Sequence, residues 1–149
     1  MPTVERVSRT DAGLASELRM SVMRLRRRLA NERDPANDLS IPVMAVLGAL
    51  FRHGELTVGE LASIERVQPP TMTRKVNLLE EGGYVLRRPH ETDGRVVVVT
   101  LTEQGRARVV ADRKRRDEWL SRQLRDLTAA ERDVLRAAAP ILQRLSERD

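Results

Sequence analysis

The chain has 149 residues, of which 33% are charged, and it carries a formal net charge of +5 at pH 7. This length suits one domain and is enough to bury a sizeable core. The positive charge is almost all arginine and favours an anionic partner such as nucleic acid, although arginine-rich codon usage would give the same balance. Because there is no cysteine, disulfides, thiolate metal sites and thiol-based redox switches are excluded. The sequence has no signal-peptide core and no apolar run that could span a bilayer, so we expect a cytoplasmic protein with no membrane partner.

A long amphipathic helix is predicted over residues 11–33. Its apolar residues recur at spacings of four and three, at Leu14, Leu18, Val22, Leu25 and Leu29. Arg24 and the arginines at 26–28 lie on the same segment, but acidic residues flank them, so a solvated face is the favoured interpretation. A second helix is predicted over 41–51, followed by a turn at 53–55.

A helix-turn-helix pattern follows. Thr57 and Glu60 have the spacing of a capping box, which predicts a short helix that begins at Val58. We expect its inward face to consist of Leu61, Ala62 and Ile64. The stretch 67–70 contains two prolines and separates this helix from the next, because proline restricts the residue before it but is tolerated in a first helical turn.

The next helix is predicted from Pro70 until Gly82 and Gly83 end it. Its inward side carries Met72, Val76 and Leu79, at helical spacing. Its opposite side carries Thr71, Thr73, Arg74 and Asn77. Short hydroxyls and an arginine near the start of such a helix suit entry into the major groove, where arginine can donate two hydrogen bonds to guanine. Any amphipathic helix has a polar face, however, so a merely solvated surface is the alternative.

A β-hairpin is predicted over residues 84–101. Asp93-Gly94 is a strong turn signal, and the β-branched run at 96–99 suits a strand. The tip would be crowded by three arginines, Arg87, Arg88 and Arg95. Arginine on such a projection can contact phosphates or enter the minor groove. Asp93 can also pair with Arg95 to stabilise the turn, and this pairing would orient the arginine toward the DNA.

Two further helices are predicted after the hairpin. Residues 105–127 form a long, highly charged helical pattern, and Thr128 with Glu131 makes a second capping box. The last helix carries an apolar stripe at Val134, Ala138, Ile141 and Leu145. Helices this charged bury little by themselves, which favours pairing of the first and last helices across a two-fold axis. An intramolecular bundle is the alternative.

A helix-turn-helix followed directly by a basic hairpin is typical of the winged helix-turn-helix, and it predicts binding to double-stranded DNA. The candidate DNA-binding residues are Thr57, Gln68, Pro69, Pro70, Thr71, Thr73, Arg74, Asn77, Arg87, Arg88, Asp93 and Arg95.

Three segments also carry a family resemblance. Asp93-Gly94-Arg95 has the Asp-x-Arg pattern of a known wing, residues 70–84 look like the recognition helix and its exit, and residues 101–105 look like the start of a long helix. In this combination the chain resembles the MarR family of bacterial transcriptional regulators over nearly its whole length. The resemblance implies a mainly α fold with a small antiparallel β wing, in a single domain over 1–149. In it a winged helix-turn-helix at 40–102 is flanked by dimerisation helices at 11–33 and 105–148.

The resemblance further implies a homodimer that binds a pseudo-palindromic operator, commonly as a repressor released by a small anionic or phenolic effector. For dimerisation the candidate residues are Leu14, Val134, Ala138, Ile141 and Leu145. An effector in the crevice between the dimer helices and the winged region would alter the separation of the two recognition helices. The candidate lining residues are Leu18, Arg19, Val22, Arg26, Met44, Leu47 and Phe51, for which plain core packing is the more ordinary interpretation.

Other classes of function have less support. The sequence contains no glycine-rich phosphate loop, nucleophile elbow or paired acid–base set, so we expect neither an enzyme nor a cofactor. His53 and His90 lie far apart without a set of carboxylates, which argues against a metal site. The remaining alternative is a winged-helix protein-interaction module that binds an acidic partner without sequence-specific DNA binding.

Overall fold

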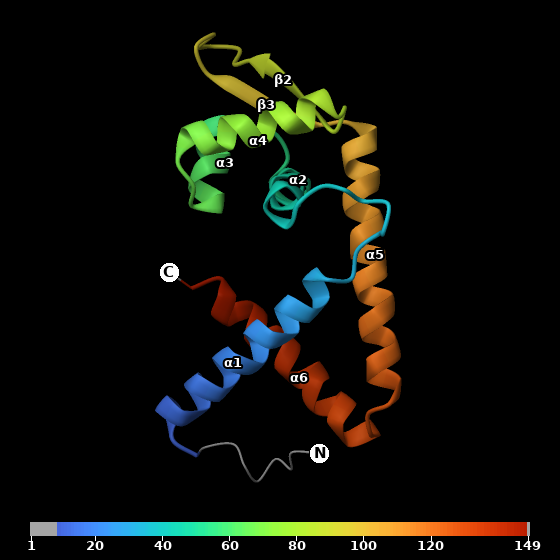
Figure 1. Ribbon diagram of the computed structural model, residues 1–149. Helices are drawn as coiled ribbons and strands as arrows, with labels where there is room; N and C mark the ends of the chain where they lie inside the picture. Colours follow the sequence, from blue (N-terminus) through green and yellow to red (C-terminus); the bar gives the residue numbers. More distant parts are fainter. Residues whose placement is uncertain (1–8, 149) are drawn as a thin grey trace.

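The computed structural model describes residues 9–148, and its fold is mainly helical with one small antiparallel sheet. The elements are α1 (Asp11–Ala30), α2 (Ile41–His53), β1 (Leu56–Thr57), α3 (Val58–Glu65), α4 (Pro69–Glu81), β2 (Val85–Pro89), β3 (Val97–Leu101), α5 (Glu103–Arg125) and α6 (Ala129–Ser146). The elements from α2 to β3 gather at one end of the long helix α5, and α1 and α6 cross near its other end (Figure 1). Among the described residues, no helix is both long enough and apolar enough to cross a membrane.

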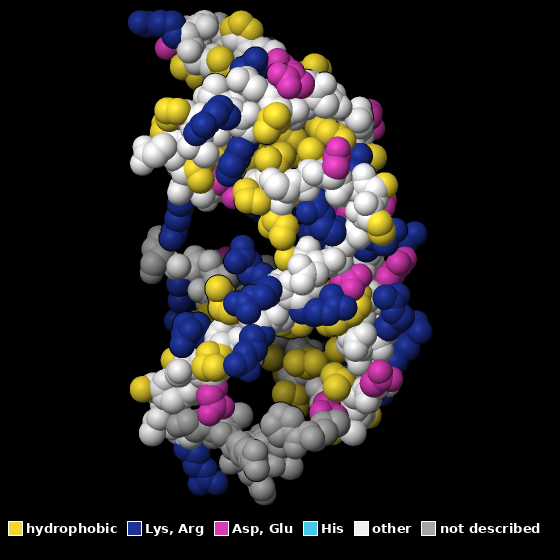
Figure 2. Space-filling model, in the orientation of Figure 1, with side chains coloured by type: hydrophobic (Ala, Val, Ile, Leu, Met, Phe, Trp, Pro, Cys, Tyr) yellow, Lys and Arg dark blue, Asp and Glu magenta, His cyan; other side chains and the backbone are white. Residues whose placement is uncertain are grey.

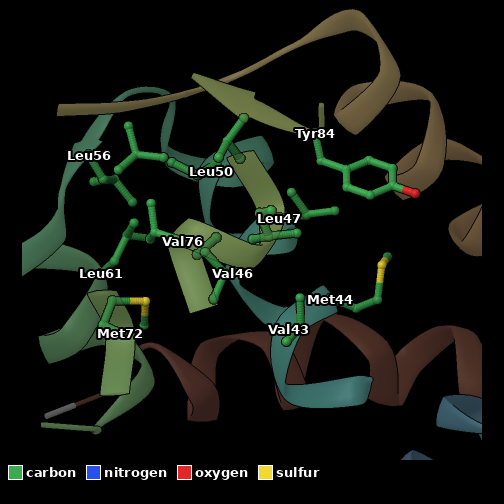
Figure 3. Close-up of a cluster of buried hydrophobic side chains, with 14 of the residues drawn as sticks. Val43, Met44, Val46, Leu47, Leu50, Leu56, Leu61, Met72, Val76 and Tyr84 are labelled. Carbon is green, nitrogen blue, oxygen red and sulfur yellow. The ribbon is translucent and has the colours of Figure 1, made fainter. Parts of the chain in front are cut away.

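The hydrophobic core lies between α2, α3, α4 and the sheet (Figure 3). The sheet has the strand order β1-β3-β2, and Val99 of β3 pairs with Leu56 on one side and Arg87 on the other. The fully buried side chains include Leu47, Leu61, Met72, Val76, Leu79, Val85 and Val99. Each such side chain contributes roughly 1.5 to 3 kcal/mol by leaving water. This burial fixes α4 relative to the hairpin, so the two form one packed unit.

Local signals set the ends of α3 and α4. The Thr57 hydroxyl accepts a hydrogen bond from the Glu60 amide at 3.0 Å, and the Glu60 carboxylate accepts one from the Thr57 amide at 3.1 Å, so the predicted capping box is confirmed. Helix α4 begins at Pro69, one residue earlier than predicted, with both prolines in its first turn. It ends at Glu81, and Gly83, two residues later, has a φ of 81°, which suits a residue without a Cβ.

The start of α5 is packed tightly against the exit of α4. The Thr102 hydroxyl donates a hydrogen bond to the Gly83 carbonyl at 2.6 Å, and Arg108 donates one to the Tyr84 hydroxyl at 3.0 Å. A Cβ on Gly105 would lie 2.1 Å from the Tyr84 carbonyl oxygen. Glycine at this position therefore lets the long helix leave directly from the base of the hairpin.

A buried carboxylate attaches the α1–α2 connection to the middle of α5. Asp112 is only 1% exposed and accepts hydrogen bonds from the Asn37 side-chain amide at 3.1 Å and the Asp34 backbone amide at 3.4 Å. The guanidinium of Arg28 also lies 4.4 Å from the centre of the Trp119 ring. These contacts join residues 28–37 to α5, two segments that are far apart in the sequence.

Several sequence-based expectations need correction. Ile64 is 40% exposed, because the core covers the side of α3 that carries Leu61 and Ala62, and Ile64 lies at the edge of that face. Helix α1 ends at Ala30 rather than at residue 33, and α5 begins at Glu103 and ends at Arg125. The arginines at 24 and 26–28 are exposed, as a solvated face requires.

Candidate nucleic-acid interface

The outer face of α4 presents one unpaired arginine. Arg74 is exposed, and its guanidinium makes no hydrogen bond or ion pair within residues 9–148. Thr71 is half-buried, and the Thr73 hydroxyl donates to the Pro69 carbonyl at 3.0 Å. Asn77 is half-buried, and its side-chain oxygen is covered without a hydrogen-bond partner among the described residues. Of the four residues predicted on this face, Arg74 is the one most free to reach a base.

The residues at the start of the helix-turn-helix have mixed roles. The Thr57 hydroxyl is engaged in capping α3, so a structural role accounts for this candidate. Gln68 occupies the N-cap of α4 without a side-chain capping bond, and it is exposed together with Pro69 and Pro70. The amide of Gln68 is therefore available to a partner at the N-terminal end of α4.

The tip of the hairpin has the predicted ion pair. The Arg95 Nε lies 3.5 Å from the Asp93 carboxylate, which also accepts a hydrogen bond from the Arg95 amide at 3.1 Å. The Arg95 side chain is nevertheless 94% exposed. The aspartate thus holds the turn while the arginine extends into solvent.

Arg87 and Arg88 are not free groups at the tip, contrary to expectation. Arg87 donates two side-chain hydrogen bonds to the Glu80 carboxylate, at 3.0 and 3.2 Å, and Arg88 pairs with Glu55. These hydrogen bonds from Arg87 lower the pKa of Glu80 below its ordinary value. The two arginines lie in β2, before the tip, where acidic groups of α4 and of the α2–β1 turn are within reach. They therefore fix the hairpin to the helices that carry it.

The two solvent-exposed arginines, Arg74 and Arg95, belong to neighbouring parts of the surface. The tip of the hairpin and the N-terminal end of α4 lie on the same side of the molecule (Figure 1). Figure 2 shows lysine and arginine side chains at the tip and over α4, with more of them over α1. This geometry suits a helix in a groove with a basic projection beside it.

A cavity of about 530 Å³ lies between α1, α2 and α5. Five arginines line it, together with the buried carboxylate of Asp112. These arginines are Arg26, Arg33, Arg52, Arg113 and Arg116. The Nε of Arg33 is covered and has no hydrogen-bond partner in the described chain. The electrostatic character of the cavity suits an anion.

The predicted cavity residues are divided between several environments. Val22, Arg26 and Met44 line the cavity. Leu47 does not, because it is fully buried in the core of the winged region. Phe51 lies beneath two guanidinium groups, those of Arg106 and Arg113, whose carbons are 5.4 and 4.4 Å from the ring centre. Leu18 and Arg19 are outside the cavity lining. The sequence pattern missed the arginines of α5, since only the fold brings them to this cavity.

The predicted dimerisation residues are mostly uncovered. Val134 is 64% exposed, Ile141 is 48% exposed, and Leu14 and Leu145 are similarly open, whereas Ala138 is half-buried. No residue of α1 or α6 is fully buried. An intramolecular bundle therefore does not bury these stripes.

The fold and the exposed arginines define a winged helix-turn-helix protein. A sequence profile of the MarR family matches residues 39–97. An HTH-type transcriptional regulator of Mycobacterium bovis is 44% identical over 133 residues, which cover 89% of this chain and 92% of that protein. The chain belongs to the MarR family of HTH-type transcriptional regulators, a family of DNA-binding proteins and not of enzymes.

Solved structures agree with this assignment. A crystal structure from Pseudomonas aeruginosa matches with a TM-score of 0.81 and 35% identity, over 95% of this chain and 100% of that one. A MarR family protein from Bacillus stearothermophilus matches with a TM-score of 0.78 and 27% identity, over 94% and 97% of the two chains. Among the sequence relatives, a protein of Bacillus subtilis that is named as a transcriptional repressor is 34% identical over 96 residues, which cover 62% of this chain and 59% of that protein.

Proposed function

We propose that this chain is a homodimeric repressor that reads a pseudo-palindromic operator with α4 and contacts the flanking DNA with its wing. The observation that carries the proposal is a pair of exposed arginines on one packed unit. Arg74 on α4 is unpaired, and Arg95 at the wing tip is 94% exposed although it pairs with Asp93. Arginine on a recognition helix can discriminate guanine, and arginine on a wing can contact the backbone or the minor groove. One relative, from Bacillus subtilis, is named as a transcriptional repressor, which supports repression as the outcome of binding.

The dimer is supported by the apolar stripes of α1 and α6. These side chains remain exposed in a single chain, and a second copy can cover them through the same surface on each subunit. A two-fold dimer of winged units would place two recognition helices about one DNA turn apart, ~34 Å. The symmetry of the protein would then be matched by the symmetry of the operator.

A small anionic effector is the proposed signal, and the arginine-lined cavity is its proposed site. The cavity contacts α1 and α5, which belong to the dimerisation region, and α2, which belongs to the winged region. A ligand there shifts the spacing of the recognition helices only if it binds one spacing more tightly than the other. Salicylate at millimolar concentration should therefore weaken operator binding and change the fluorescence of Trp119, which lies on α5. Unchanged operator affinity with every phenolic or carboxylate ligand tried would remove this part of the proposal.

The experiment that tests DNA reading is a salt titration of binding to random-sequence duplex and to an operator selected from it. Counterion release predicts that both affinities fall steeply with salt, with a specific excess of ~10³-fold or more for the operator. A protein with no salt-sensitive duplex binding would instead act through protein interaction.

A further inference from the structure

The turn between α3 and α4 contains an arginine in an unfavourable backbone conformation. Arg66 has φ 53° and ψ 46°, and it is the one non-glycine residue with positive φ among the described residues. Its amide donates to the Ser63 carbonyl at 3.3 Å, and the next amide, of Val67, donates to the Ala62 carbonyl at 3.0 Å. This is the glycine position of a helix-ending motif. At the end of α4 the chain does place a glycine there, Gly83.

The side chain of Arg66 forms no interaction with the described residues that would offset the strain of this backbone conformation. A left-handed backbone brings Cβ close to the following carbonyl, so a residue other than glycine is disfavoured. Arg66 is exposed, and its guanidinium forms no hydrogen bond, ion pair or ring contact with any residue from 9 to 148. By contrast, Arg87 and Arg88 are both paired with carboxylates.

The position of Arg66 points to a partner outside the chain. It lies three residues before Pro69, where α4 begins, and that end of α4 is on the same side of the molecule as the wing tip (Figure 1). If the N-terminal end of α4 enters a major groove, the turn before it must lie close to the sugar-phosphate backbone at the edge of that groove.

We propose that Arg66 is a DNA-backbone contact, whose guanidinium binds a phosphate beside the groove that α4 enters. This inference rests on the proposed DNA-binding function. Because a phosphate carries no base identity, the contact strengthens binding to every sequence without changing the preference between sequences. The chain thus keeps a strained arginine where glycine would suit the turn.

The test compares wild-type protein with Arg66→Gly and Arg66→Lys, on random-sequence duplex and on a selected operator. Arg66→Gly should keep or raise the Tm, since it removes the strain, yet weaken both affinities by on the order of 10-fold or more. The slope of log affinity against log salt should fall by ~0.9 for each lost contact, or about 1.8 for a dimer. Arg66→Lys should keep most of the slope. Arg66→Asn, which also tolerates the left-handed backbone, serves as the second charge-free variant if the glycine variant is destabilised.

Arg125→Gln is the matched control, because it removes one positive charge at the far end of α5. Its salt slope should equal that of the wild type. Wild-type binding that persists unchanged in Arg66→Gly and Arg66→Asn, or a slope that falls equally in Arg125→Gln, would overturn the role of Arg66. Absence of duplex binding by the wild type would overturn the proposed function itself, which is a separate result.

Discussion

Arg74 and Arg95 differ in what each can contact on a duplex. Arg74 is on the helix proposed to enter the major groove, so Arg74→Ala should relax base preference by ~1 to 3 kcal/mol at the position it reads. Arg95 is at a projecting tip, so Arg95→Ala should weaken binding to all sequences with the preference retained. Binding measured on an operator and on its single-base variants separates the two effects. Equal loss of discrimination in both variants, or no loss in either, would contradict these roles.

At Gly105, close packing rather than φ excludes any residue with a Cβ. A Cβ there would be 2.1 Å from the Tyr84 carbonyl oxygen, and backbone cannot move aside as a flexible side chain can. Gly105→Ala should therefore destabilise the fold by roughly 1 to 3 kcal/mol or more, measured by urea unfolding. Gly94→Ala is the matched control, since a Cβ at Gly94 meets nothing within 4 Å. Its effect should stay within about 0.5 kcal/mol. A Gly105 variant as stable as the control would show that α5 shifts freely at this point.

At the scale of elements, the Glu80–Arg87 pair joins α4, the proposed recognition helix, to the hairpin. The pKa of Glu80 is lowered, chiefly by the side-chain hydrogen bonds from Arg87, so the carboxylate binds a proton less readily in the folded chain than in the unfolded one. The stability it contributes is therefore present above its ordinary pKa of 4.5 and is lost as the pH falls through the lower folded pKa. Glu80→Gln should be less stable than the wild type at pH 7, and this difference should shrink in acid. Urea unfolding at both pH values measures it, with Glu81→Gln, at an exposed neighbour on the same helix, as the control. A difference that stays constant with pH would contradict the pairing.

Elements whose causes are local could be predicted from the sequence, whereas contacts between elements could not. The capping box of Thr57 and Glu60 and the prolines before α4 act within a few residues, so their spacing is readable. The partner of Arg87 is on another element. The sequence of β2 does not indicate that the Glu80 carboxylate lies 3.0 Å from the Arg87 guanidinium. The left-handed backbone of Arg66 could not be predicted from the sequence either, because arginine, unlike glycine, is not typical of that conformation. The candidate site was thus predicted by region, but the division between free and paired arginines needed the fold.

At the scale of the whole molecule, the uncovered stripes of α1 and α6 determine how the proposed repressor would function. Two winged units on one dimer would bind a two-part operator together. Their combined affinity would commonly exceed that of a single unit by about 10² to 10⁴-fold. Helix α6 carries an exposed isoleucine, Ile141. A charge at this position would be buried without a partner if a second copy covered the stripe, and the free-energy cost of that burial would oppose dimerisation.

We therefore expect Ile141→Asp to be monomeric by sedimentation and to bind the selected operator on the order of 100-fold more weakly. Its helical circular dichroism should be retained, because the core of the winged region lies apart from α6 and contains no α6 residue. Ile64→Asp, which places the same charge at an exposed isoleucine of α3, should leave the oligomeric state unchanged. If Ile141→Asp remained dimeric, or if the wild type sedimented as a monomer that still bound the operator tightly, the two recognition helices would have to be coupled through another surface. The long charged face of α5 would then be the next place to introduce a substitution, since it also extends from the winged region to α6 (Figure 1).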